Sequence, residues 1–172
     1  MKKFALGTRF WIAGAMSVAL VAACTLGIGS VALGQDQSAA TAKDVIFARK
    51  ILMSSIGENM DELDTMVETN SIDVAHGASH ADAISVMMLS FPHLFPPASN
   101  EWKPNVDKDP GTDTFAAPEI WTRFADFYQR SSEAAKSAYN ASRARNEEEF
   151  KKYVTELRAD CDGCHALYQK KN

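Results

Sequence analysis

Residues 157–172, LRADCDGCHALYQKKN, close the chain and hold two cysteines and a histidine within five positions. Cys161 and Cys164 are three residues apart, and His165 follows Cys161 by four. Residues at these spacings lie on the same face of an α-helix, one turn apart. The stretch therefore predicts a C-terminal helix that presents three reactive side chains together.

The pattern C-x-x-C-H is typical of c-type haem attachment. Two thiols can add to the two vinyl groups at one edge of a porphyrin, and the adjacent imidazole then reaches the iron. A redox disulfide would accompany a βαβ pattern, and a structural zinc site needs four ligands, for which no second cysteine pair exists. We predict one covalently attached haem c, with thioethers at Cys161 and Cys164 and His165 as the proximal iron ligand.

Four segments show the three- and four-residue spacing of apolar side chains that is typical of amphipathic helices. Thr41 is suited to the N-cap of the first helix, and Asn146 with Glu149 three residues later forms a variant of the capping box before the last. No segment shows convincing period-two alternation. The predicted helices cover residues 42–68, 72–89, 118–139 and 146–168.

All six prolines lie between Phe91 and Pro118. Because proline fixes φ and lacks an N–H donor, this segment is predicted to be a long connection and not a fifth helix. Such loops are uncommon in compact domains unless they serve a function. The sequence thus predicts an all-α fold, an antiparallel four-helix bundle with a long Pro-rich connection between helices 2 and 3.

The N-terminus has a different character. The first nine residues, MKKFALGTR, are basic, and residues 10–34 carry no charge. This pattern predicts a signal peptide over residues 1–34, cleaved after Gly34, and a periplasmic monohaem four-helix-bundle domain over residues 35–172. Two alternatives remain: the uncharged run is long enough to span a membrane if uncleaved, or LVAAC, ending at Cys24, is a lipidation signal.

Composition limits the classes of partner and activity. Hydrophobic residues make up 46% of the chain, enough for a core, and the formal net charge is −4. A negative chain gives no electrostatic reason to bind nucleic acid. We predict no enzyme, because redox or ligand chemistry at a haem needs no catalytic side chain beyond it.

With this motif and these helices, the chain resembles the class II c-type cytochromes, the cytochrome c-prime family and its low-spin His/Met relatives. The resemblance covers residues 40–172. One departure is Gln169, where the family often has an arginine close to the proximal imidazole. The similar motifs are ARKILMSSIGENM at 48–60, FPHLFPP at 91–97, PEIW at 118–121 and CDGCHALYQKK at 161–171.

The resemblance places Met53 over the iron, opposite His165. It implies a periplasmic electron carrier with His165/Met53 coordination, because a thioether suits a haem that cycles between two oxidation states. The alternative is a high-spin, five-coordinate cytochrome that binds NO or CO, in which Met53 is core packing. The resemblance also places Arg49 near a haem propionate, where a guanidinium suits a carboxylate; a solvated helix charge is the alternative.

Other features carry weaker expectations. His76 and His80, four apart, are expected to be ordinary surface histidines, although they could in principle hold a metal, and His93 is expected to be exposed. Four aromatic residues could line the haem pocket or serve as bundle core: Trp121, Phe124, Phe127 and Tyr128. The expected partners are redox proteins and a second copy of the chain, since the resemblance implies a dimer through the first two helices. The small-residue face AHGASHADA (75–83) could allow such close helix packing or could equally be buried within the bundle. A haem-free helical interaction module is a third class.

Overall fold

The structure, a computed structural model, describes residues 41–104 and 113–170. The predicted signal peptide and Cys24 lie outside these residues. The described part of the chain contains five α-helices and two short 3-10 helices, and no strand beyond one isolated bridge. The elements are α1 (Ala42–Glu68), α2 (Val74–Ser90), η1 (Phe91–Leu94), η2 (Pro97–Ser99), α3 (Glu119–Thr122), α4 (Phe124–Ser142) and α5 (Glu147–Tyr168).

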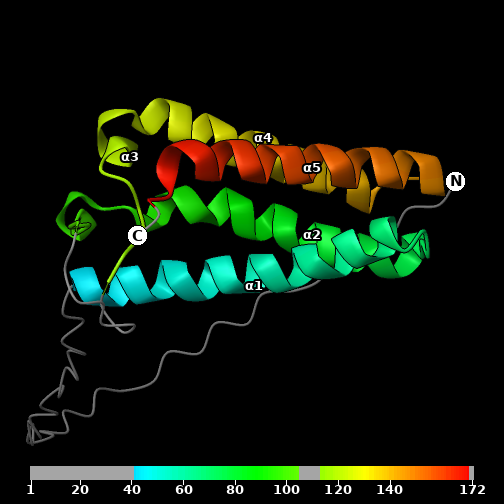
Figure 1. Ribbon diagram of the computed structural model, residues 1–172, viewed down its shortest axis with the longest axis horizontal. Helices are drawn as coiled ribbons and strands as arrows, with labels where there is room; N and C mark the ends of the chain where they lie inside the picture. The colour runs from blue at the N-terminus through cyan, green and yellow to red at the C-terminus, as the bar shows by residue number, and fades with distance from the viewer. Residues whose placement is uncertain (1–40, 105–112, 171–172) are drawn as a thin grey trace, which may run out of the picture. The chain divides into compact units, whose positions relative to one another are not determined.

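The four long helices form the predicted antiparallel bundle (Figure 1). Helix α1 packs against α2, α2 against α4, α4 against α5, and α5 meets α1 again. Successive long helices run in opposite directions, and the crossover between α2 and α4 returns to the end of the bundle where α5 finishes (Figure 1). The predicted all-α class and bundle architecture are therefore confirmed.

The helix starts follow from capping chemistry. Thr41 accepts a hydrogen bond from the Asp44 N–H, and the Asp44 carboxylate accepts one from the Thr41 N–H at 2.9 Å, which completes a capping box. Asn146 likewise accepts from the Glu149 N–H at 2.9 Å. The carboxylate of Glu149, however, accepts from the N–H of Arg145 and not from Asn146, because its ion pair with the Arg145 guanidinium draws it one residue upstream.

The predicted third helix is interrupted. Arg123, with φ −126° and ψ 37°, separates the single turn α3 from α4. Tertiary contacts explain the break: Ile120 is buried, and the Ala117 N–H just before α3 donates to the carbonyl of Tyr168 at 2.9 Å. The end of α5 thus holds α3 in place, and this attachment outweighs the tendency of the segment to continue as one helix.

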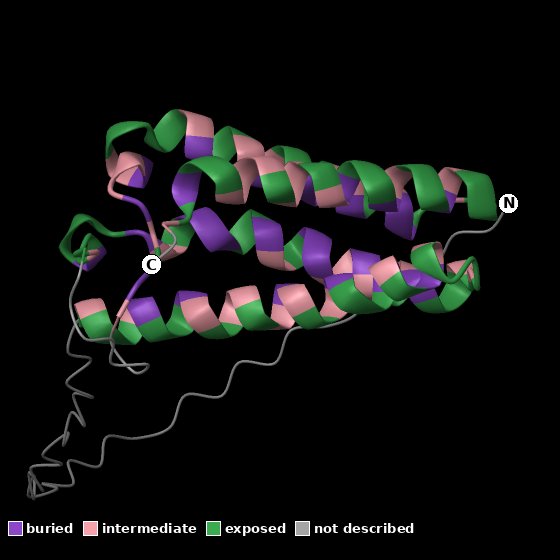
Figure 2. Cartoon of the chain, in the orientation of Figure 1, coloured by how far each residue is buried: buried purple, intermediate pink, exposed green. Residues whose placement is uncertain are grey.

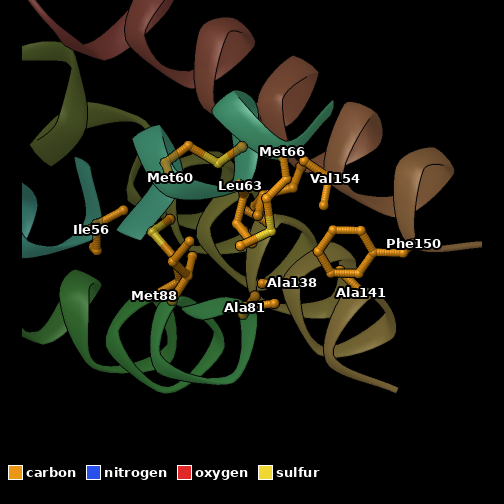
Figure 3. Close-up of a cluster of buried hydrophobic side chains, with 14 residues drawn as sticks. Ile56, Met60, Leu63, Met66, Ala81, Met88, Ala138, Ala141, Phe150 and Val154 are labelled. Atoms are coloured by element: carbon orange, nitrogen blue, oxygen red, sulfur yellow. The ribbon is translucent and has the colours of Figure 1, made fainter. Parts of the chain in front are cut away.

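Two clusters of buried side chains form the core. The inward-facing sides of the helices are buried (Figure 2), and the larger cluster, drawn in Figure 3, is contributed by all four long helices. The small-residue face of α2 is used inside the bundle, since Gly77 and Ala81 are buried. The second cluster lies at the crossover end and comprises Phe91, Phe95, Ile120, Phe127 and Tyr168.

Candidate haem site

Helix α5 places Cys161, Cys164 and His165 on the wall of one cavity of about 400 Å³. All three side chains are half-buried, and neither thiol is in a disulfide. The volume lies within the range of about 300–1,000 Å³ that is usual for small-molecule and cofactor sites. The predicted attachment residues therefore line one cavity, which is large enough to receive a cofactor.

The protonation of these groups follows from their burial. Burial raises the pKa of the Cys161 thiol to about 11 and that of Cys164 to about 11, because a thiolate is poorly solvated in the cavity wall. The same effect lowers the pKa of His165. At neutral pH the site therefore presents two protonated thiols and a neutral imidazole, and a neutral imidazole is the form that binds a metal.

Helices α1 and α2 supply an apolar part of the cavity wall. Met53 is half-buried and packs against both core clusters. Ile56 and Met60 lie one and two turns further along α1, and Met88 comes from α2. Met53, which the resemblance placed over the iron, thus lines the same cavity as His165.

The crossover, α4 and the end of α5 add aromatic rings. Phe91 and Phe95 lie edge to face with centroids 5.1 Å apart, and Phe127 meets the ring of Tyr168 at 5.3 Å. Each of these four residues lines the cavity. The two phenylalanines of FPHLFPP were not predicted as site residues, although apolar rings within a proline-rich connection signal that part of it is buried.

The four aromatic candidates separate into different roles. Phe127 is buried at the cavity. The indole N–H of Trp121 donates to the carbonyls of Phe95 and Pro96 and so fastens the crossover. Phe124 and Tyr128 are exposed on α4, so for these two residues both interpretations, pocket and core, are wrong.

Arg49 is not a solvated helix charge, which corrects that alternative: only 4% of the residue is exposed. Its guanidinium donates to the Ser99 hydroxyl at 3.0 Å, the Ser99 carbonyl at 3.1 Å and the Thr114 hydroxyl at 2.6 Å. It also lies 4.7 Å from the centre of the Phe95 ring. Burial lowers its pKa to about 10, so it stays charged at neutral pH, at the edge of the cavity.

Two further charged groups near the site, Arg158 and Asp126, were not predicted from the sequence. Arg158 lines the cavity and pairs with Asp64 of α1. Asp126 accepts hydrogen bonds from Arg130 at 2.9 Å and from the Tyr168 hydroxyl at 2.5 Å. The partners in Arg158–Asp64 and Tyr168–Asp126 are 94 and 42 residues apart in the sequence, so helical periodicity alone could not reveal these two pairs. Asp126 and Arg130, by contrast, are four apart on α4.

The remaining histidines lie on the surface or near it. His93 is exposed, as expected, and its ring is edge-on to Tyr128. His76 and His80 face each other across one turn of α2. Within residues 41–104 and 113–170, no three or more His, Cys, Asp and Glu side chains cluster as a metal site, and none of the helices there is long and apolar enough to cross a membrane.

The residues present fit a covalently bound haem. Two thiols and a neutral imidazole share a helix face, and the wall of the cavity before them includes methionine, isoleucine and aromatic side chains. Fold and site together define a helical-bundle haem protein of the c type.

Comparisons with known proteins identify the family. The model of the family described as Cytochrome C' matches residues 44–169. A cytochrome c' from Pararhodospirillum photometricum is 28% identical over 125 residues, spanning 71% of this chain and 93% of the relative. The chain belongs to the cytochrome c' family, whose members bind a covalently attached c-type haem.

Solved structures agree with the fold. The cytochrome c' of Rhodopseudomonas palustris superimposes with a TM-score of 0.64 at 26% identity, covering 75% of this chain and 98% of that one. A variant of the cytochrome c prime from Alcaligenes xylosoxidans, in its ferrous form with bound NO, superimposes with a TM-score of 0.63 at 18% identity and covers 77% and 98% of the two chains. The chain therefore is a haem cytochrome with the cytochrome c' fold.

Proposed function

We propose that this protein is a periplasmic, five-coordinate haem protein that binds NO or CO. The observation that carries the proposal is the apolar stretch of the α1 and α2 wall: Met53, Ile56, Met60 and Met88 offer no hydrogen-bond donor and no charge. Such a stretch suits a small, neutral, diatomic ligand. The polar side chains that α1 adds to the cavity are those of Arg49, Lys50 and Ser54. No catalytic residue is required.

The proposed roles on α5 follow from the chemistry of its side chains. Cys161 and Cys164 would hold the haem through thioether bonds, and His165 would bind its iron. A bound c-type haem would supply an iron atom that can coordinate a gas. Met53 would then pack beside the haem without binding its iron, and the Arg49 guanidinium would pair with a haem propionate.

The comparisons support this function over the His165/Met53 electron carrier. The family model, the curated relative and the solved structures are all of the cytochrome c' type, and one of those relatives holds NO in its solved structure. The electron carrier is the alternative function, because a thioether sulfur can bind haem iron and Met53 lines the same cavity as His165.

The absorption spectrum and CO kinetics of the purified holoprotein and its Met53→Leu variant test the proposal. Leucine has nearly the volume of methionine but no sulfur, so packing is kept. We expect a high-spin ferrous wild type, unchanged in spin state by the substitution. A low-spin wild type that becomes high-spin only in Met53→Leu, and not in the control Met60→Leu, would establish the electron carrier instead.

We also propose that the protein is exported, because a basic start and an uncharged run over residues 10–34 are typical of a signal peptide. The mass of the secreted protein tests it: cleavage after Gly34 leaves a mature chain that begins at Gln35 and carries one haem. A retained N-terminus, or a lipid on Cys24, would make the protein a membrane-anchored cytochrome.

A homodimer is proposed through the outer faces of α1 and α2. Phe47 and Ile51, one turn apart on α1, are more than half exposed, as are Val86 and Leu89 on α2. A structurally similar cytochrome c' (TM-score 0.65, 20% identity, covering 77% of this chain and 98% of that one) shows a ligand-controlled dimer dissociation. Sedimentation should give a dimer for the wild type and a monomer for Phe47→Glu.

The control for the dimer is Tyr139→Glu, because Tyr139 is similarly exposed, at 51%, but lies on α4. It should leave the dimer intact. A monomeric wild type at high protein concentration would remove the dimer from the proposal.

A further inference from the structure

We propose that His76 and His80 form a zinc-binding site on the surface of α2, separate from the haem. The two residues are four apart on the helix, so their rings share one face. Their Nε2 atoms lie 3.3 Å from each other. Imidazole nitrogen is a preferred ligand of Zn²⁺.

The orientation of His80 is set by a chain of hydrogen bonds. The amide nitrogen of Asn59 donates to the carbonyl of Ser55 at 2.8 Å, which turns its amide oxygen toward α2. That oxygen lies 2.9 Å from Nδ1 of His80. Because an amide oxygen can only accept, Nδ1 carries the proton and Nε2 carries the lone pair. His80 is thus held in the tautomer that binds a metal through Nε2.

This arrangement has the form of a metal site with its supporting contact. Histidines that bind metals commonly donate their other ring N–H to a carbonyl or carboxylate, which fixes the tautomer and the ring. Asn59, from α1, makes that contact to His80. The first turn of α2 is itself fixed, since the side chain of Asp73 accepts from the His76 N–H at 3.0 Å.

The separation of the two nitrogens matches one metal. Two Zn–N bonds of about 2.0–2.1 Å at a tetrahedral angle put the nitrogens about 3.3–3.4 Å apart, close to the 3.3 Å observed. Without metal, the Nε2–H of His76 donates to Nε2 of His80 across this distance. To bind the metal, the exposed ring of His76 carries its proton on Nδ1 and rotates so that its Nε2 lone pair meets the same point. No third His, Cys, Asp or Glu of the described residues joins the pair, so water completes the coordination and binding is moderate.

The pair is remote from the proposed haem ligands. Gly77, next to His76, lies against Phe150, and Phe150 precedes Cys161 by eleven residues on α5, or about 16 Å of helix. Zinc can therefore bind without displacing the haem, and the haem spectrum reports independently whether the protein is intact.

Calorimetric titration of the untagged holoprotein with Zn²⁺ tests the site. We expect the wild type to bind one Zn²⁺ ion per chain at this site and His76→Ala and His80→Ala to bind none there. Asn59→Ala should bind the ion with 10- to 100-fold weaker affinity. Asn59→Asp should bind at least as tightly as wild type, because a carboxylate accepts the same proton. His93→Ala is the matched control and should be unchanged.

Each variant must keep the wild-type haem spectrum, so that loss of zinc is not loss of fold. Absence of stoichiometric binding by the wild type, or equal affinity in wild type and His80→Ala, would overturn the site. Equal affinity in wild type and Asn59→Ala would overturn the role of Asn59.

Discussion

Gly77 stands where α2 passes the ring of Phe150, which points into the cluster of Figure 3. A Cβ at this position would lie 2.3 Å from Cζ of Phe150 and 3.2 Å from the sulfur of Met66. Overpacking of this kind costs about 1–3 kcal/mol, against a helix-propensity gain of about 1 kcal/mol for alanine. We expect Gly77→Ala to destabilise the protein in denaturant unfolding, despite alanine's better helix propensity.

The matched variants for Gly77 isolate the clash. Phe150→Leu in the Gly77→Ala background removes the clashing ring atoms, so the two substitutions together should cost less than the sum of their separate costs. Ser79→Ala, exposed on the same helix, should change the free energy of unfolding by less than about 0.5 kcal/mol. A Gly77→Ala protein more stable than wild type would show that α2 can shift away from α5 at little cost.

Arg49 links α1 to two parts of the crossover, through Ser99 and Thr114. Replacing it by methionine leaves Ser99 and Thr114 without their buried donor, at a cost of about 3 kcal/mol and with faster hydrogen exchange near both residues. Lys43→Met is the control, because Lys43 is exposed on the same helix and surface substitutions usually change the free energy of unfolding by less than about 0.5 kcal/mol. Equal effects of the two substitutions would contradict the buried role of Arg49.

At the scale of the element, the start of α5 depends on one side chain. Asn146→Ala removes the acceptor for the Glu149 N–H and should destabilise the protein by about 1 kcal/mol in thermal unfolding. Asn146→Ser keeps an oxygen at the N-cap and should stay close to wild type. If alanine and serine behave alike, the ion pair of Glu149 with Arg145, and not the cap, holds this helix start.

The sequence was sufficient for the helices but not for the way they are joined. Apolar spacing and the capping residues Thr41 and Asn146 predicted all four long helices, because both signals are local. The break at Arg123 was not predicted, since it depends on contacts with the end of α5, about 45 residues later in the sequence. The burial of Phe91 and Phe95 likewise depends on which helices receive the crossover.

At the scale of the whole molecule, acid should release the end of α5. Hydrogen bonds from Tyr168 and Arg130 hold the pKa of Asp126 below its ordinary value. A carboxyl with a lowered folded pKa contributes stability above its unfolded pKa of about 4 and loses it as pH falls through the folded value. The melting temperature of Asp126→Asn should therefore fall less than that of wild type between about pH 5 and pH 2.

Tyr168→Phe provides the comparison for this pH effect, because it removes the hydroxyl that donates to Asp126 and leaves the carboxyl. It should weaken the acid dependence without abolishing it, since Arg130 still lies 2.9 Å from the carboxylate. Parallel melting curves for wild type and Asp126→Asn across this range would show that other carboxylates control acid unfolding.

The site residues that lie close together in the sequence were predictable, whereas contacts between distant segments were not. Cys161, Cys164 and His165 lie within five positions, and helical spacing alone put them on one face. The partners of Arg49 and the ion pair of Arg158 with Asp64 come from distant segments, and no spacing rule connects them. The role of Met53 depends on whether its sulfur binds the haem iron, and neither helical spacing nor packing determines that.

The position of the attachment motif in the α4–α5 hairpin has a consequence for folding order. This hairpin closes through residues 143–146 and carries both cysteines and His165, whereas Met53 precedes Cys161 by 108 residues. Local closures are fast and distant ones slow, because the chain entropy of a long loop must be lost first. We expect the thiol-bearing hairpin to form before α1 covers it, so a folding chain would expose its attachment face to solvent until the final closure.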